Sequence, residues 1–237
     1  MPSGVRAALE PELVRVEFGH GHVFYKRGEP IEAVHFPLEG VISVITELSD
    51  GSAVETATVG RDGAVGLAAM LAPVRASGTT IGQAPGAVLS TPVEALRRLA
   101  GESPELRRLA VGYIDVLLAQ AQQSVACNIL HDVEERFCRW LLMCDDRVTG
   151  GRVDLTQEFL AQMLGVQRTT VSQVAGGLQS AGLIRYSRGR IEILDRAGLT
   201  LRSCECYETV RRLMREALPL SNDALTPTSS ADQRALG

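Results

Sequence analysis

The first part of the chain alternates short apolar runs with glycine turns. From Phe18 to about Ser90, glycines recur in FGHGH, KRGEP, LEGV, SDGS, VGRDG and APGA, and runs such as VISVI and AVLST lie between them. Short apolar runs separated by turn signals roughly every 8–12 residues are typical of an all-β sandwich or barrel. Pro37 interrupts one run, and because proline cannot donate to a β-ladder we expect it at an edge or a bulge.

The pattern becomes helical after Pro92. Residues 105–143 contain no proline and a single glycine, Gly112. Apolar and then more polar side chains recur there at alternating four- and three-residue steps, at Leu106, Ala110, Tyr113, Leu117, Gln120, Ser124 and Cys127. A stripe with this period on one long helix is typical of helix–helix packing. We interpret its first six positions as a dimer interface, and a second helical segment, VEERFCRWLLMCDDR, follows it.

Two short helices joined by a glycine are predicted next. Thr156 is a suitable N-cap for the first helix, which has an apolar face that includes Phe159 and Leu160 and stops at Gly165. The second helix is predicted to start near Gln167 and to end at Gly182. Two short helices connected in this way are the signature of a helix-turn-helix.

The second of these helices separates an apolar side from a polar side. At 100° per residue, Val171, Val174 and Leu178 fall together on one side. Arginine matches the guanine edge, glutamine the adenine edge, and the threonine methyl group suits thymine. We therefore predict that the opposite side reads DNA bases through Arg168, Thr169, Ser172 and Gln173.

The charge distribution supports a DNA contact in this segment. The whole chain has a net charge of −4, yet between Glu158 and Ile191 it holds four arginines and no further acid or lysine. A carboxylate facing a DNA phosphate is repelled, whereas an arginine neutralises one. The last part of the segment predicts a basic β-hairpin around a turn at residues 187–189. The predicted contacts to the DNA backbone are Thr156, Gln167, Thr170, Arg185, Arg188 and Arg190.

The cysteines suggest a second, weaker candidate site. The chain has five of them, an odd number that favours free thiols in a cytoplasmic protein. Thiolates and imidazole suit zinc or an iron–sulfur cluster, and the candidate ligands are Cys127, His131, Cys138, Cys204 and Cys206. Their spacings match no closed ligand template, so small buried side chains and incidental thiols are the favoured interpretation, with a metal or redox site as the alternative.

Other classes of protein are not supported by the sequence. No apolar run has the length of a membrane span, and the first ten residues lack the apolar centre of a signal peptide, so we expect a cytoplasmic protein without a membrane partner. No serine–histidine–aspartate pattern, phosphate loop or metalloprotease motif indicates an enzyme. The residues near the C-terminus are rich in Ser, Thr, Pro and Ala, which predicts a disordered tail over residues 219–237.

Taken together, these features resemble the Crp/Fnr family of bacterial transcription regulators. The resemblance covers about residues 14–199 and is carried by RGEP at 27–30, LEGVISV at 38–44, DG at 50–51 and GVQRTTVSQ at 165–173. It implies an α+β fold with a jelly-roll-like β-roll sensor domain (1–103), a dimerisation helix and connection (104–144) and a winged helix-turn-helix domain (145–218). It also implies a homodimer on a palindromic operator, with double-stranded DNA and RNA polymerase as partners.

The resemblance also bears on the operator and the effector. Family members often read bases with an Arg-Glu pair and a later Arg, and the matching positions here are Arg168, Thr169 and Gln173, so a different operator is expected. Relatives that bind cyclic AMP have Gly-Glu and then Arg-Ser in the phosphate cassette. Here Leu67 follows Gly66, which would leave a ribose hydroxyl unpaired at a cost of ~1–3 kcal/mol, so cyclic AMP binding is not expected. The candidate effector pocket is Val65, Gly66, Leu67, Arg75 and Ser77.

Two alternatives remain open beside a DNA-binding regulator with an unknown effector. One is a signalling module that captures a small ligand or a cyclic nucleotide, and the other is a regulator that senses metal or redox state through Cys and His. Oxygen-sensing relatives carry cluster-binding cysteines near the N-terminus, and this chain has no cysteine before Cys127.

Overall fold

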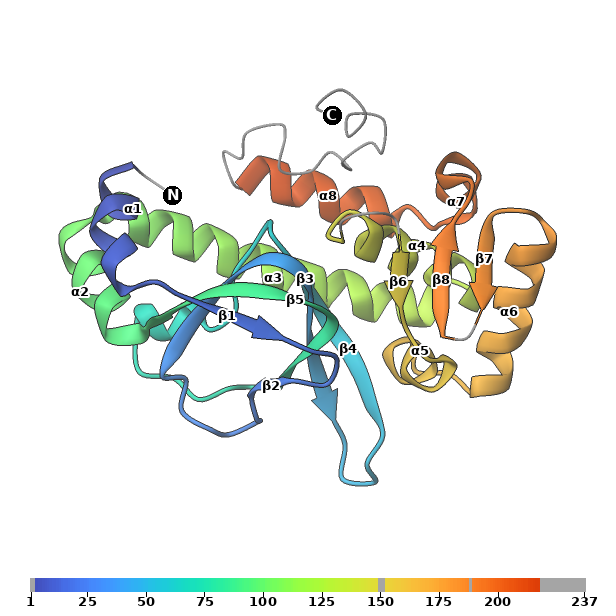
Figure 1. The fold of residues 1–237 in the computed structure, drawn as a ribbon, viewed down its shortest axis with the longest axis horizontal. Helices are drawn as coiled ribbons and strands as arrows, with labels where there is room; N and C mark the ends of the chain where they lie inside the picture. Colours follow the sequence, from blue (N-terminus) through green and yellow to red (C-terminus); the bar gives the residue numbers. More distant parts are fainter. Residues whose placement is uncertain (1–2, 149–151, 188, 218–237) are drawn as a thin grey trace, which may run out of the picture.

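The first half of the chain folds into an antiparallel β-roll. The computed structural model describes residues 3–148, 152–187 and 189–217, and the predicted tail (219–237) and Arg188 lie outside these ranges. The strands of the roll follow the order β1-β5-β3-β4, and β2 also pairs with β5. Their bounds are β1 Val14–Phe18, β2 Val23–Tyr25, β3 Ala33–Glu47, β4 Ala53–Val59 and β5 Thr79–Pro92 (Figure 1).

The longest strands, β3 and β5, are bent where they pair. Their register shifts between Pro37 and Glu39 and again near Val41, so Pro37 lies at a bulge as the sequence predicts. Gly40 has a φ of +83°, and a Cβ on it would lie 2.6 Å from the carbonyl oxygen of Pro85. A glycine is therefore needed there for the two backbones to approach each other.

Helices cover one side of the roll and lead out of it. They are α1 Ser3–Leu9, the 3-10 turns η1 Glu10–Glu12 and η2 Leu67–Met70, α2 Val93–Glu102 and α3 Pro104–Leu130. Ser103 caps α3, since its side chain accepts a hydrogen bond from Leu106 N, and the 27-residue helix is about 40 Å long. The helical path breaks at His131, and α4 Val133–Asp145 begins with a capping box made by Asp132 and Glu135.

The stripe predicted as the dimer interface faces the interior of the protomer. Leu106, Ala110, Tyr113, Gln120 and Ser124 are each at most 7% exposed, and α3 packs with them against α2, η2, β4 and α8. Leu117 is half-buried against the roll. Side chains already buried inside one chain are not free to contact a second chain, so the prediction for these residues is corrected. The heptad-like period identified a packed face of the helix, but this face packs within the chain.

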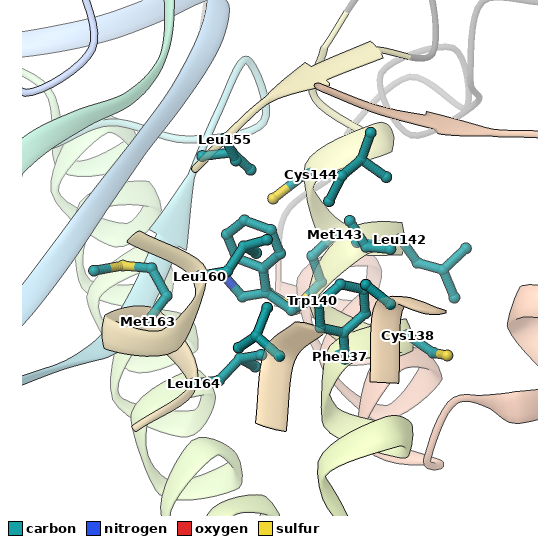
Figure 2. Close-up of a cluster of buried hydrophobic side chains, with 14 of the residues drawn as sticks. Phe137, Cys138, Trp140, Leu142, Met143, Cys144, Leu155, Leu160, Met163 and Leu164 are labelled. Atoms are coloured by element: carbon teal, nitrogen blue, oxygen red, sulfur yellow. The ribbon is translucent and has the colours of Figure 1, made fainter. Parts of the chain in front are cut away.

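The last part of the chain forms a winged helix-turn-helix unit. Its elements are β6 Arg152–Asp154, α5 Gln157–Leu164, α6 Arg168–Ser180, β7 Ile184–Ser187, β8 Arg190–Ile193, α7 Arg196–Arg202 and α8 Cys206–Ala217, and its sheet has the order β6-β8-β7. Its core is built on α4, where Phe137, Trp140 and Leu141 are at most 1% exposed. Figure 2 shows Leu160 and Leu164 of α5 packed around Trp140. The fold class predicted from the sequence is thus confirmed.

The unit also packs directly against the β-roll. Ile45 on β3 belongs to the same buried cluster as the α4 side chains. Trp140 Nε1 donates a 2.8 Å hydrogen bond to Glu55 on β4, and Arg147 forms a buried 2.7 Å ion pair with Asp62. Among the described residues, no helix has the length and apolar character needed to span a membrane.

Candidate nucleic-acid interface and neighbouring sites

Local sequence signals place the two helices of the motif. The Thr156 hydroxyl accepts a hydrogen bond from Phe159 N at 3.2 Å, which caps α5 at its first turn. Gly165 adopts a left-handed φ of +63° and ends α5. α6 then starts at Arg168 with Gln167 as its N-cap residue, and Gly182, with a φ of +74°, follows its end.

α6 has a buried side and an exposed polar side. Val171, Ala175 and Leu178 are buried in the core of the unit, and Val174 is half-buried. The opposite side is exposed and carries the predicted base-reading residues Arg168, Thr169, Ser172 and Gln173. Of the predicted backbone contacts near this helix, Thr156 and Gln167 are exposed and Thr170 is half-buried. The structure therefore brings these seven side chains to one end of the unit.

Gln157 joins the start of α5 to this polar side. Its Oε1 lies 3.0 Å from Ser172 Oγ and 3.4 Å from Arg168 Nε, and both of these atoms donate to it. A depression between the two helix starts and the hairpin is lined by Thr156, Gln157, Glu158, Arg168, Tyr186 and Gly189. Gln157 and Tyr186 were not among the site residues predicted from the sequence. Gln157 could have been predicted from its position directly after the N-cap residue Thr156, where its side chain faces the following helix.

The predicted basic hairpin is the β7–β8 hairpin. Gly189, with a φ of +77°, lies at its turn. Arg185 and Arg190 lie exposed on its two strands. Arg185 forms an exposed 2.8 Å ion pair with Glu192, and this carboxylate partly neutralises the charge of the arginine. Two of the three predicted hairpin arginines are therefore exposed on the hairpin, and the third, Arg188, is outside the described residues.

A pocket of about 320 Å³ lies between the β-roll and α3. Val65, Gly66, Leu67 and Ser77 line it, whereas Arg75 does not, since its guanidinium donates to the Gly28 carbonyl at 2.8 Å on the outside. None of the lining residues carries a charged side chain, and its hydroxyl groups come from Tyr25, Thr56, Ser77 and Thr80. The wall supplied by α3 consists of Ile114, Leu117, Leu118 and Ala121.

Gly66 fixes the shape of this pocket. Its φ is +86°, and a Cβ there would lie 2.5 Å from the Tyr25 hydroxyl and 2.8 Å from the Ala33 carbonyl oxygen. That hydroxyl donates to the same carbonyl at 2.8 Å. The glycine is thus required both by the backbone conformation and by the closeness of the tyrosine.

Four of the five predicted metal or redox residues come together in space. The ligand atoms of Cys127, His131, Cys204 and Cys206 all lie within 4.8 Å of one another. Cys138 is not among them, because the break in the helical path at His131 turns α4 away, and it lies in the main core instead. Burial there raises the pKa of Cys138 to about 12. The prediction of Cys138 as a ligand is therefore wrong.

The cluster has polar neighbours that influence its thiols. A hydrogen bond from Cys204 lowers the pKa of Cys127, against the burial that raises it, and the positive charge of Arg139 adds to the lowering. Gln123 Nε2 donates to Cys206 Sγ at 3.0 Å, and His131 Nε2 lies 3.1 Å from Glu205 Oε2.

Comparisons with known proteins agree with this architecture. The cyclic nucleotide-binding domain family matches residues 15–103, and the Crp-like helix-turn-helix domain family matches residues 135–202. A "CRP-like cAMP-activated global transcriptional regulator" from Mycobacterium tuberculosis is 28% identical, over 85% of this chain and 93% of the relative. A "Global nitrogen regulator" from Synechocystis is 22% identical, over 81% of this chain and 89% of that protein.

The fold has close counterparts among solved structures. FixK2 from Bradyrhizobium japonicum superposes with a TM-score of 0.70 at 20% identity, covering 81% of this chain and 98% of that one. A regulator of the CRP family from Thermus thermophilus superposes with a TM-score of 0.65 at 21% identity, over 79% of this chain and 96% of that one. With both domains matched in the same order along the chain, this protein belongs to the Crp/Fnr family of transcription regulators.

Proposed function

We propose that this protein is a cytoplasmic, sequence-specific regulator that binds a palindromic operator as a homodimer. The observation that carries this proposal is the exposed polar side of α6, which has no acidic residue on it, on a helix that contacts β7 of the basic hairpin. In winged helix-turn-helix proteins such a helix enters the major groove while neighbouring elements contact phosphates.

The side chains divide into two roles. Arg168, Thr169, Ser172 and Gln173 are proposed to contact base edges, since all four are exposed on one side of α6. The proposed backbone contacts are Thr156, Gln167, Thr170, Arg185, Arg188 and Arg190. Gln157 is proposed as a positioning residue, because it accepts from both Arg168 and Ser172 and so restrains the two side chains before DNA binds.

A second copy of the chain is proposed to cover the exposed face of α3. Val111, Leu118 and Val125 are spaced seven residues apart and are 56%, 56% and 61% exposed, and Ile129 extends the stripe at 75%. Apolar side chains at this spacing form the seam of a two-helix coiled coil. A two-fold axis along α3 would present two copies of α6 to two half-sites of a palindrome.

The pocket in the β-roll is proposed to take a neutral, mainly apolar effector. Its lining is uncharged, and Leu118 belongs both to its wall and to the exposed stripe of α3. An effector that moves this wall would therefore act directly on the dimer face. RNA polymerase is the proposed protein partner.

The base-reading role is tested by comparing two arginine variants on two DNAs. The preferred site is first selected from a random DNA pool with the wild-type protein. Arg168→Ala is expected to lose ~1–3 kcal/mol of affinity for that site and much less for random DNA, because a bidentate arginine–guanine pair is sequence-dependent. Arg190→Ala is expected to weaken binding to both DNAs about equally. It should also reduce the salt dependence of the binding constant by about one released counterion.

Arg15→Ala supplies the matched control. Arg15 lies exposed on β1 of the sensor domain, and its replacement removes the same charge without changing the DNA-binding unit. Its affinities for both DNAs are expected to equal those of the wild type. Equal losses of Arg168→Ala on selected and random DNA would contradict the proposed reading of bases by α6.

A further inference from the structure

Three buried cysteines form a small cluster of their own at the end of α3. Cys127, Cys204 and Cys206 are at most 4% exposed and contact one another, separate from the larger apolar clusters. His131, the residue that ends α3, completes the group, with its Nδ1 3.5 Å from Cys206 Sγ. Four good metal ligands, from parts of the chain more than 70 residues apart, therefore share one small volume.

The spacing of the four atoms fits a single tetrahedral ion. With Zn–S bonds of about 2.3 Å and Zn–N bonds of about 2.0–2.1 Å, a tetrahedron separates two sulfurs by about 3.8 Å and a sulfur from a nitrogen by about 3.5 Å. The Cys127 and Cys204 sulfurs are 3.5 Å apart, and the Cys206 sulfur and the His131 nitrogen are also 3.5 Å apart. No pair among the four ligand atoms is more than 4.8 Å apart, which is within about 1.3 Å of these tetrahedral separations.

The surroundings of the cluster are those of a metal site. A metal-binding imidazole usually donates its second ring N–H to a carboxylate, which fixes the tautomer. Here His131 Nε2 lies 3.1 Å from Glu205 Oε2, so the imidazole N–H would lie on that side and leave Nδ1 free to bind a metal. Gln123 Nε2, 3.0 Å from Cys206 Sγ, supplies a donor that stabilises a thiolate.

The other two cysteines show what an ordinary buried cysteine looks like in this chain. Cys138 and Cys144 belong to the main core, which contains Phe137, Trp140 and Leu141. Cysteines that act as small apolar side chains pack in this way. Cys144 also accepts a hydrogen bond from an amide, Gln83 Nε2, at 3.0 Å, whereas the three clustered cysteines have one another's sulfurs and an imidazole as neighbours. Their arrangement is therefore better explained by a shared ligand than by packing.

We propose that Cys127, His131, Cys204 and Cys206 bind one zinc ion, which fastens the end of α3 to the connection between α7 and α8. Three thiolates and one imidazole form a closed ligand set, which is typical of structural rather than catalytic zinc. Two ligands come from the dimerisation helix and two from the DNA-binding unit, where α8 runs alongside α3 (Figure 1). The ion would thus hold the unit that carries α6 in a defined orientation on α3.

Metal content tests this proposal directly, and its result does not depend on DNA binding. The wild-type protein, purified without chelators and desalted, is expected to contain about one zinc ion per chain when measured by inductively coupled plasma mass spectrometry. The Cys204→Ser variant is expected to contain less than about a tenth of that amount of zinc. Cys138→Ser is the matched control, because it also replaces a buried cysteine, and it is expected to keep its zinc.

A second measurement uses the wild-type chain, so it does not depend on a variant folding. Exchange of the bound ion for Co²⁺ should produce the strong visible bands of tetrahedral cobalt with thiolate ligands, and a chelator should lower the melting temperature of the wild type. Wild-type protein that holds no zinc and shows no such cobalt bands would overturn the proposal. So would a Cys127–Cys204 disulfide in freshly purified protein, or iron and sulfide with visible absorbance, which would identify a cluster in place of zinc.

Discussion

Glu55 is an acidic side chain buried where the β-roll meets α4, and its hydrogen bonds indicate its protonation state. Ser43 Oγ lies 2.5 Å from both Glu55 Oε1 and Gln83 Oε1. One hydroxyl hydrogen can serve only one of these two acceptors. A proton on Glu55 resolves the conflict, since the carboxyl group then donates to Ser43 while Ser43 donates to Gln83. Burial independently raises the pKa of Glu55, against the hydrogen bonds that lower it.

This arrangement predicts how stability changes with pH. Below the ordinary pKa of 4.5 the carboxyl group is protonated in both the folded and the unfolded chain. As the pH rises above that value the unfolded chain ionises first, so the wild type should lose free energy of unfolding, by up to about 1.4 kcal/mol per pH unit, until the folded pKa is reached. Glu55→Gln keeps a neutral donor and acceptor in place and should lack this loss.

Urea unfolding of both proteins between pH 4 and pH 9 measures the difference. Glu17→Gln, at an exposed glutamate on β1, is the control and should follow the wild type. Parallel stability curves for the wild type and Glu55→Gln would mean that Glu55 is ionised in the folded protein.

At the scale of the elements, the exposed stripe of α3 predicts how the proposed dimer is held. Leu118→Asp places a charge at the centre of the stripe formed by Val111, Leu118 and Val125. Burying that charge against a second helix is unfavourable, so sedimentation at micromolar concentration should change from dimer to monomer. Leu201→Asp makes the same substitution at a side chain that is 89% exposed on α7, and it should remain dimeric. A dimer that survives Leu118→Asp would place the interface elsewhere.

The same helix shows what could be predicted from the sequence and what could not. The helix-turn-helix was predictable because a cap at Thr156 and a glycine at position 165 fix local backbone geometry. The stripe available to a second chain was not predictable, because both the buried and the exposed stripes of α3 repeat at heptad spacing. Periodicity alone does not say which of the two stripes another part of the same chain covers. The cysteine cluster was only partly predictable, because it depends on α8 returning along α3, a tertiary contact with no local signal.

At the scale of the whole molecule, sensor and DNA-binding unit form one packed body in this state. The buried Asp62–Arg147 pair and the Glu55–Trp140 hydrogen bond both connect the β-roll to the α4 region. The proposed signal from the pocket would reach the rest of the molecule through the wall that α3 supplies to the pocket. The residues that line the pocket are uncharged, so the proposed effector would act by filling space and moving that wall rather than by pairing charges.

The uncharged lining of the pocket predicts that cyclic AMP does not bind tightly. An anionic phosphate entering this pocket would lose water without gaining a charged partner, since Arg75 is held outside by the Gly28 carbonyl. Calorimetry should therefore show no tight binding of cyclic AMP, in contrast to what the name of the mycobacterial relative says of that protein. A neutral apolar dye should bind in its place, and Ala57→Phe, which fills the pocket, should abolish the dye signal. A sub-micromolar dissociation constant for cyclic AMP would contradict the prediction and would require a phosphate contact from a residue outside the observed lining.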